Sequence, residues 1–260
     1  MSEELKVPTM ADYMAEGKQP EILFWVGSAG SYDDRAKKIS KAFVKILNKA
    51  NVDFAVLGAE ESNTGDVAKR AGNEFLFQMQ AMMNIEVLNG YEVKRIVTCD
   101  PHSFNCLKNE YPSLGGNYDV IHHTQFIQEL IESGRLKVEG DTYKGKRITF
   151  HDPCYLGRAN GVYDAPRNVL QNTNASLTEM KRHKSTALCC GAGGAQMFKE
   201  PEKGDKDVNV LRTEDALETQ PDIIATGCPY CNTMMTDGVK AKEKEGEISV
   251  LDIAELIANS

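Results

Sequence analysis

The second half of the chain repeats the first, and this repeat limits the folds that the chain can adopt. When the sequence is shifted on itself by 126 to 128 residues, Ile224–Thr226 falls on Ile96–Thr98. The same shift places Cys228–Cys231 on Asp100–Ser103, with a proline in second position of both segments. A segment of about 125 residues that occurs twice predicts two copies of one folding unit. We expect an N-terminal extension at residues 1–20, a first repeat at 21–135, a charged, glycine-bearing linker at 136–146 and a second repeat at 147–260.

Each repeat alternates short apolar runs with segments of helical periodicity. The expected strands are residues 21–26, 52–57, 95–98 and 119–122, and then 147–151, 176–179, 222–226 and 248–251. The expected helices are residues 34–50, 67–88, a segment after Pro101, and 124–133, and then 166–171, 208–218, 230–242 and 252–258. This alternation predicts an α/β fold of two homologous repeats with mainly parallel sheet. In such folds, sites lie on the loops that follow the carboxyl ends of the strands.

The helix expected at 67–88 is unusually apolar and carries Met79, Met82 and Met83. A surface for a partner is one interpretation of these methionines. We expect instead that they fill the core, because methionine is a common gap filler in protein interiors.

Composition narrows the class of protein. Hydrophobic residues make up 41% of the chain and charged residues 26%, which favours a packed globular core. The net charge of −8 argues against nucleic acid as a partner, because phosphate binding requires a basic surface. Residues 1–20 lack the basic start and apolar run of a signal peptide, and no apolar stretch is long enough to span a membrane. We therefore expect a cytoplasmic protein whose thiols are metal ligands or redox groups rather than disulfides.

Five of the seven cysteines form one pattern in the second repeat. They are Cys154, the adjacent pair Cys189 and Cys190, and Cys228 and Cys231 of a C-P-Y-C segment. Thiolate sulfur is the ligand that iron–sulfur clusters require. Cys228 and Cys231 open an expected helix, whose N-terminus favours the thiolate form. Zinc is the rival metal, but it usually takes four ligands, often from two C-x-x-C pairs, and the sequence has one such pair.

The first repeat has lost the corresponding sulfurs. The equivalent positions hold Ser28, Ser62, Asn63, Asp100 and Ser103. Neutral hydroxyl and amide groups hold iron poorly, so we expect this repeat to be a scaffold or a docking surface. A hard-cation site built from Asp100, His102 and Asn63 is a weaker alternative. The two remaining cysteines, Cys99 and Cys106, are shifted off the ligand positions, and we interpret them as free thiols.

Three further residues of the second repeat are candidates for supporting roles. His151 lies three residues before Cys154, where it could donate a hydrogen bond or carry a proton, although a structural histidine is the competing interpretation. Arg158 and Arg167 could offset the negative charge of a cluster, or form ordinary ion pairs.

The segments 154, 189–191 and 228–231, together with His151–Arg158, resemble the cysteine-rich CCG domain, which typically occurs twice per protein. This domain is found in the B subunit of heterodisulfide reductases and in iron–sulfur subunits of glycolate oxidase, anaerobic glycerol-3-phosphate dehydrogenase and lactate-utilisation complexes. The resemblance covers nearly the whole chain. It implies one [4Fe-4S] cluster per chain, either cubane or non-cubane, on the five cysteines of the second repeat, and it leaves the first repeat without a cluster.

The resemblance implies an iron–sulfur oxidoreductase subunit that carries electrons through this cluster. The sequence has no G-x-G-x-x-G motif for a dinucleotide and no ferredoxin-type cysteine run, so we expect a ferredoxin-like or flavin-containing partner subunit. A disulfide or a small 2-hydroxy acid is the substrate class that the resemblance suggests. Two alternatives remain: a non-catalytic assembly or docking subunit of a redox complex, and a zinc-binding structural protein.

Overall fold

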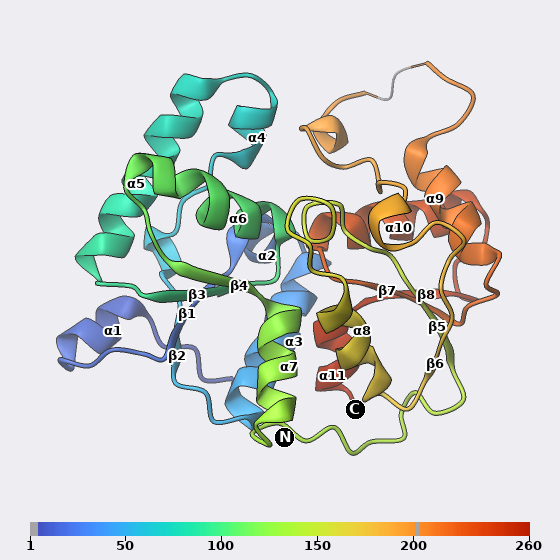
Figure 1. Ribbon diagram of the computed structural model, residues 1–260, viewed down its shortest axis with the longest axis horizontal. Helices are drawn as coiled ribbons and strands as arrows, with labels where there is room; N and C mark the ends of the chain where they lie inside the picture. The colour runs from blue at the N-terminus through green and yellow to red at the C-terminus, as the bar shows by residue number, and fades with distance from the viewer. Residues whose placement is uncertain (1–4, 201–202) are drawn as a thin grey trace. The chain divides into compact units, whose positions relative to one another are not determined.

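The computed structural model describes residues 5–200 and 203–260 (Figure 1). The chain divides into two compact units, with the boundary between Lys137 and Val138. Each unit contains one sheet of four parallel strands. Within the described residues, no helix combines the length and the apolar character that a membrane crossing requires.

The two sheets have the same strand order. In unit 1 the order is β2 (Phe54–Ala55), β1 (Ile22–Trp25), β3 (Arg95–Thr98) and β4 (Asp119–His122). In unit 2 the order is β6 (Ser176–Leu177), β5 (Arg147–Phe150), β7 (Ile223–Thr226) and β8 (Ser249–Asp252). Every strand pair in both sheets is parallel. The prediction of two homologous α/β repeats with parallel sheets is confirmed.

Helices cover both faces of each sheet (Figure 1). Unit 1 contains α1 (Met10–Ala15), α2 (Gly27–Tyr32), α3 (Ala36–Lys49), α4 (Asp66–Arg70), α5 (Glu74–Gly90), α6 (Pro101–Asn105) and α7 (His123–Glu132). Its shorter turns are the 3-10 segments Gly58–Glu60 and Tyr111–Leu114 and the π-helical segment Cys106–Glu110. Unit 2 contains α8 (Asp164–Gln171), α9 (Val208–Leu217), α10 (Pro229–Ala241) and α11 (Ile253–Ala258), with 3-10 turns at Lys184–Thr186 and Gln196–Phe198.

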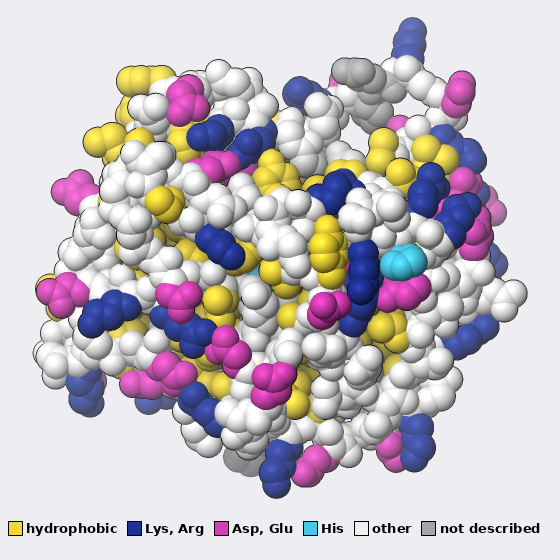
Figure 2. Space-filling model, viewed as in Figure 1, with side chains coloured by type: hydrophobic (Ala, Val, Ile, Leu, Met, Phe, Trp, Pro, Cys, Tyr) yellow, Lys and Arg dark blue, Asp and Glu magenta, His cyan; other side chains and the backbone are white. Residues whose placement is uncertain are grey.

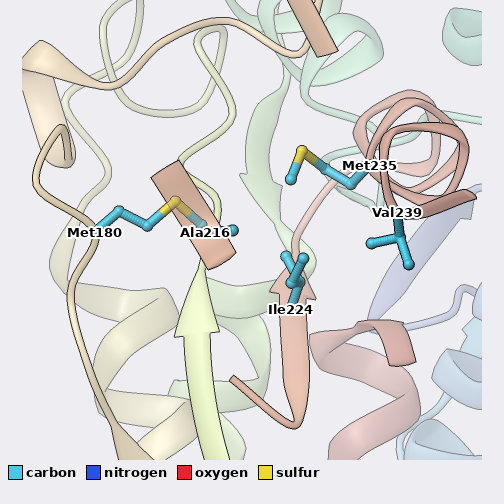
Figure 3. Close-up of a cluster of buried hydrophobic side chains, with 5 residues drawn as sticks. All are labelled: Met180, Ala216, Ile224, Met235 and Val239. Atoms are coloured by element: carbon cyan, nitrogen blue, oxygen red, sulfur yellow. The ribbon is translucent and has the colours of Figure 1, made fainter. Parts of the chain in front are cut away.

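The central strands are buried on both faces, which is why they read as continuous apolar runs. In unit 2, Ile224 of β7 packs in one cluster with Met235 and Val239 of α10 (Figure 3). Ala216 of α9 and Met180 complete this cluster. It anchors α9 and α10 on one side of the sheet, and α10 carries two of the cysteines of the pattern.

The expected helix at 67–88 is two helices. Gly72 adopts a left-handed conformation with φ +85°, which ends α4, and the side chain of Asn73 caps α5 by accepting a hydrogen bond from Leu76 N. The expectation that the methionines of this segment fill the core is wrong. The large apolar side chains near the start of α5 are exposed, and Figure 2 shows the hydrophobic atoms over this part of the helix. They are Phe75, Leu76, Met79, Met82 and Met83.

Two helices of unit 1 were not expected. The helix α1 lies within the segment expected to be a mere extension, and Thr9 and Asp12 form a capping box at its start. Met10 of this helix is buried, and Thr9 bridges to Val56 beside β2. The helix α2 follows β1 directly and contains two glycines, so its sequence has little intrinsic helical tendency.

Candidate metal centre

Three loops bring the five cysteines of the pattern to the carboxyl end of the second sheet. Cys154 follows β5, and Cys228 follows β7 at the N-cap position of α10. Cys189 and Cys190 lie in the irregular segment that precedes α9. Parallel strands place the loops after their carboxyl ends at one edge, which explains why residues distant in sequence meet there.

The five sulfurs form a continuous chain of contacts. Sγ of Cys154 lies 4.0 Å from Sγ of Cys189, and Sγ of Cys231 lies 3.3 Å from Sγ of Cys190. An interaction between the thiols of Cys189 and Cys190 joins these two pairs, and one between the thiols of Cys231 and Cys228 adds the fifth sulfur. None of the five forms a disulfide. The spacing predicted that these side chains share one place in the fold, and the structure brings them together.

The chain of sulfurs runs from the protein surface into the interior. Cys154 and Cys189 are partly buried, whereas Cys190, Cys228 and Cys231 are buried. Apolar groups surround the inner sulfurs, and they include Ala192, Met197, Tyr230 and Met234. Such a lining keeps water away from the inner end of the site.

Backbone N–H groups point at two of the sulfurs. Gly191 N lies 3.3 Å from Sγ of Cys189, and Cys231 N lies 3.5 Å from Sγ of Cys228. Gly191 has φ +92°, a conformation that other residues rarely adopt, so glycine is required for this turn. The second contact lies at the N-terminus of α10, where the helix favours negative charge. Both features stabilise thiolates.

In the protein without a cluster, the pKa values of these thiols shift in different directions. The hydrogen bond from Cys154 lowers the pKa of Cys189, and the same contact raises the pKa of Cys154. The contact with Cys189 also raises the pKa of Cys190, and the contact with Cys190 raises that of Cys231. Crowded, buried thiols resist the loss of several protons at once. A metal cation that replaces those protons therefore relieves the repulsion among the sulfurs.

His151 lies fully buried beneath the inner sulfurs. One of its ring nitrogens and the sulfurs of Cys190 and Cys231 all lie within 4.8 Å of one another, the one such group among the described residues. Its Nδ1 accepts a hydrogen bond of 2.9 Å from Nε of Arg212, which is also fully buried. Burial, together with the positive charge of Arg212, lowers the pKa of His151 to about 3. In the protein without a cluster the ring is therefore neutral at physiological pH, and a role for His151 as a donor or proton carrier stays a prediction.

The predicted role of Arg167 in offsetting cluster charge does not fit its contacts. Its guanidinium makes two bonds to Asp152, of 2.8 and 2.9 Å, and two to Glu179, of 2.6 and 2.9 Å. Burial raises the pKa of Asp152, but the hydrogen bonds from Arg167 outweigh burial and the net pKa is lowered. Through its bonds to Asp152, Arg167 thus fixes the position of the segment before Cys154. Arg158 is exposed and donates to the carbonyl oxygen of Ala187, next to the loop that carries Cys189.

A cavity of about 720 Å³ opens beside the outer pair of sulfurs. Cys154 and Cys189 line it, together with Gly191, Met197 and Met234. A small molecule or a partner side chain that enters this cavity reaches the outer sulfurs and not the inner ones.

In the first repeat, the equivalent place is filled by the protein's own polar side chains. Asn63 donates to Oγ of Ser28 at 3.0 Å, and Ser103 donates to Asp100 at 2.8 Å. The carboxylate of Glu61 accepts hydrogen bonds from the backbone of Val26 and Gly27, 2.9 and 2.6 Å long. Asn63 also accepts from Gly65 N, and Asp100 from His102 N. Asn63 and Asp100 of the alternative hard-cation site thus already accept hydrogen bonds from the protein's own groups.

The first repeat contains two cysteines of its own. Cys99 and Cys106 are buried and form no disulfide, in agreement with their interpretation as free thiols. Burial raises the pKa of Cys106 to about 12, and its thiol donates to the carbonyl oxygen of Thr64. An inert, protonated thiol of this kind fills space.

Comparison with known proteins places the chain in a family. The model of the CCG family, described as a cysteine-rich domain, matches residues 22–108 and 148–236. The chain belongs to this family. The two matched segments fall one in each unit, so the predicted resemblance and the internal duplication are both confirmed.

The chain is similar in sequence to three curated proteins of known name. It is 49% identical over 258 residues to the probable iron-sulfur-binding oxidoreductase FadF of Bacillus subtilis, with 99% of this chain and 36% of the relative covered. It is 44% identical over 262 residues to the EtfAB:quinone oxidoreductase of Syntrophomonas wolfei, with 98% and 36% covered. It is 35% identical over 247 residues to one of the subunits of the dihydromethanophenazine:CoB--CoM heterodisulfide reductase of Methanosarcina barkeri, with 92% and 59% covered. The chain thus spans between about one third and three fifths of the length of these relatives.

Proposed function

We propose that this chain is the electron-carrying part of an iron–sulfur oxidoreductase, and that it holds one [4Fe-4S] cluster in its second repeat. The proposed ligands are Cys154, Cys189, Cys190, Cys228 and Cys231. The observation that carries the proposal is the unbroken chain of sulfur contacts from three loops. Family membership and the names of the relatives support it.

The residues present suit such a group. Thiolates are the preferred ligands of iron–sulfur clusters, and apolar side chains around the inner cysteines provide the low-polarity surroundings that influence cluster potential. When bound, the cluster supplies a one-electron carrier. Gly191 N and the N-terminus of α10 stabilise negative charge on the sulfurs, and Arg167 holds Asp152 and thereby the loop that leads to Cys154.

Electrons require a route into and out of the chain. We propose a ferredoxin-like or flavin-containing subunit or domain as the redox partner, since relatives of the chain bear the names of redox complexes. The cavity beside Cys154 and Cys189 supports a docking or substrate position at the outer end of the site. A disulfide or a small 2-hydroxy acid remains the proposed source or destination of the electrons.

The test is the metal content of the protein. Anaerobically purified protein is expected to be brown, to contain about four iron and four sulfide ions per chain, and to give an EPR signal when reduced. Cys228→Ser is expected to lose most of this iron and signal. Cys99→Ser and Cys106→Ser are the matched controls, because both residues lie in the first repeat, and they are expected to keep it.

The same experiment separates the competing functions. Colourless protein with about one zinc and no iron would support the zinc-binding structural alternative and refute the proposed cluster. Full iron content in Cys228→Ser would refute the ligand assignment. The assembly-subunit alternative rests on the polar, sulfur-free site of the first repeat, and it predicts a stable complex with a redox partner whose activity survives loss of the cluster.

A further inference from the structure

Arg212 and His151 form a buried pair beneath the sulfur site. Both side chains are fully inaccessible to solvent, and they come from α9 and from the loop after β5. The guanidinium of Arg212 is held from its other side, because Nη1 donates to the carbonyl oxygen of Arg182 and to Asp215. Asp215 is itself fixed by two bonds from Arg182, of 2.7 and 2.6 Å. The position of Arg212 is thus set independently of the cysteines.

The hydrogen bond between Arg212 and His151 decides the tautomer of the imidazole. A guanidinium nitrogen can only donate, so Nδ1 of His151 must accept and cannot carry a proton. A neutral imidazole with a bare Nδ1 carries its proton on Nε2. Among the described residues, Nε2 of His151 is buried without a hydrogen-bond partner.

The free N–H of the ring is the group that remains available to the sulfurs. Since Arg212 occupies Nδ1, Nε2 is the nitrogen left to meet Cys190 and Cys231, whose sulfurs lie within 4.8 Å of the ring. A protonated nitrogen has no lone pair in the ring plane with which to bind iron. It can donate a hydrogen bond to thiolate or sulfide sulfur, and a buried donor without a partner needs such an acceptor.

We propose that His151 is a positioning residue that donates a fixed hydrogen bond from Nε2 to sulfur at the cluster, and that Arg212 prevents it from being an iron ligand. This inference rests on the proposed cluster site. A hydrogen bond to a sulfur stabilises the reduced cluster, which carries more negative charge, and therefore raises the reduction potential. The buried Arg212 adds a positive charge that acts in the same direction.

The first experiment needs no cluster. Metal-free protein labelled with ¹⁵N-histidine is expected to show, for His151 at neutral pH, a protonated Nε2 and an unprotonated Nδ1. The assignment uses His151→Leu, and Arg212→Met is expected to abolish the preference for this tautomer. A His151 signal with the proton on Nδ1 would overturn the inference whatever the metal content of the protein.

The second experiment uses the protein with its cluster. ENDOR and HYSCORE spectra of the reduced wild type are expected to show an exchangeable proton close to the cluster and no nitrogen bound directly to iron. Strong nitrogen coupling, of the size that a bound imidazole gives, would make His151 a ligand and overturn the inference while leaving the cluster itself established. Absence of any cluster would instead refute the proposed function.

The third readout is the midpoint potential. His151→Leu is expected to make reduction about tenfold less favourable, which for one electron is a fall of about 59 mV. Arg212→Met is expected to lower the potential as well, and Arg212→Gln, which keeps an N–H donor, to restore part of the loss. His183→Leu is the matched control, because His183 bonds the carbonyl oxygen of Met180 instead, and its potential is expected to match that of the wild type. Equal potentials in all variants would overturn the inference, and so would a loss confined to the control.

Discussion

The carboxyl group of Glu61 makes the stability of unit 1 depend on pH. It lies where the first repeat has lost its cysteines, and it accepts hydrogen bonds from Val26 N and Gly27 N. Burial raises the pKa of Glu61 to about 7, and the nearby Asp100 adds to this effect. Burial also raises the pKa of Asp100. The folded unit therefore holds protons that the unfolded chain would release.

The sign and size of the effect follow from this pKa. Between pH 4.5 and about 7 the unfolded chain has lost the proton of Glu61 and the folded unit has kept it, so stability falls as the pH rises. A pKa rise from 4.5 to about 7 corresponds to about 3 kcal/mol, at about 1.36 kcal/mol per pH unit. Above pH 7 the contribution of Glu61 becomes constant.

The assay uses the one tryptophan of the chain. Trp25 lies in β1, is fully buried and precedes the residue whose N–H bonds Glu61, so its fluorescence reports the unfolding of unit 1. Urea titrations between pH 5 and pH 8 are compared for the wild type and Glu61→Gln. The amide of the variant cannot accept both backbone hydrogen bonds, so the variant differs in stability from the wild type at every pH. The quantity compared is therefore the change in the free energy of unfolding between pH 5 and pH 8.

We expect the wild type to lose about 2–3 kcal/mol more than Glu61→Gln between pH 5 and pH 8, because part of the effect of Glu61 already develops below pH 5. Parallel curves for the two proteins would refute the reasoning. They would mean that the two backbone N–H groups stabilise the charged carboxylate enough to cancel the cost of burial.

Three further predictions concern packing and capping. Arg167→Met leaves Asp152 buried without its partner, and we expect a loss of about 3–5 kcal/mol in urea unfolding followed by circular dichroism. Gly238→Ala places a Cβ in steric conflict with Oγ1 of Thr213, and because this contact joins α10 to α9 we expect the same assay to show a loss of about 1–3 kcal/mol. Thr9→Ala removes the cap of α1, and the fluorescence of Trp25 should report a loss of about 0.5–2 kcal/mol. An unchanged midpoint in any of these variants would contradict the contact on which its prediction depends.

The sequence predicts an element well where burial and local signals agree. The strands Arg95–Thr98 and Asp119–His122 begin and end where expected, because each contains a pair of β-branched apolar residues and ends at or shortly before the N-cap of a helix, Asp100 or His122. The helix α2 escapes prediction because its six residues include two glycines and lie directly after a strand. The helix α1 leaves one local trace, the capping box of Thr9 and Asp12, within a polar segment.

Some residues of the candidate site could be predicted from the sequence and others could not. The spacing of the cysteines, with a prolyl turn and a glycine pair, was sufficient to predict that the sulfurs of three loops meet, although their role as ligands stays a prediction. Arg212 could not be found in this way, because it is 61 residues from its partner His151 and lies in a helix of mixed polarity. Glu61 was missed because an acidic residue within a polar loop ordinarily faces solvent.

The two repeats show how one fold accommodates a site with sulfur and a site without it. In the first repeat, Glu61, Asn63 and Asp100 occupy the equivalent place and form hydrogen bonds with the backbone, with Ser28 and with Ser103. In the second repeat, Nε2 of His151 and Nη2 of Arg212 remain buried without partners among the described residues. Buried polar groups without partners are costly, so the N–H of His151 near Cys190 and Cys231 suits an acceptor at the sulfur site. A buried donor that lacks an acceptor within the described part of the chain and lies near two of the five thiols favours a bound inorganic group in the second repeat.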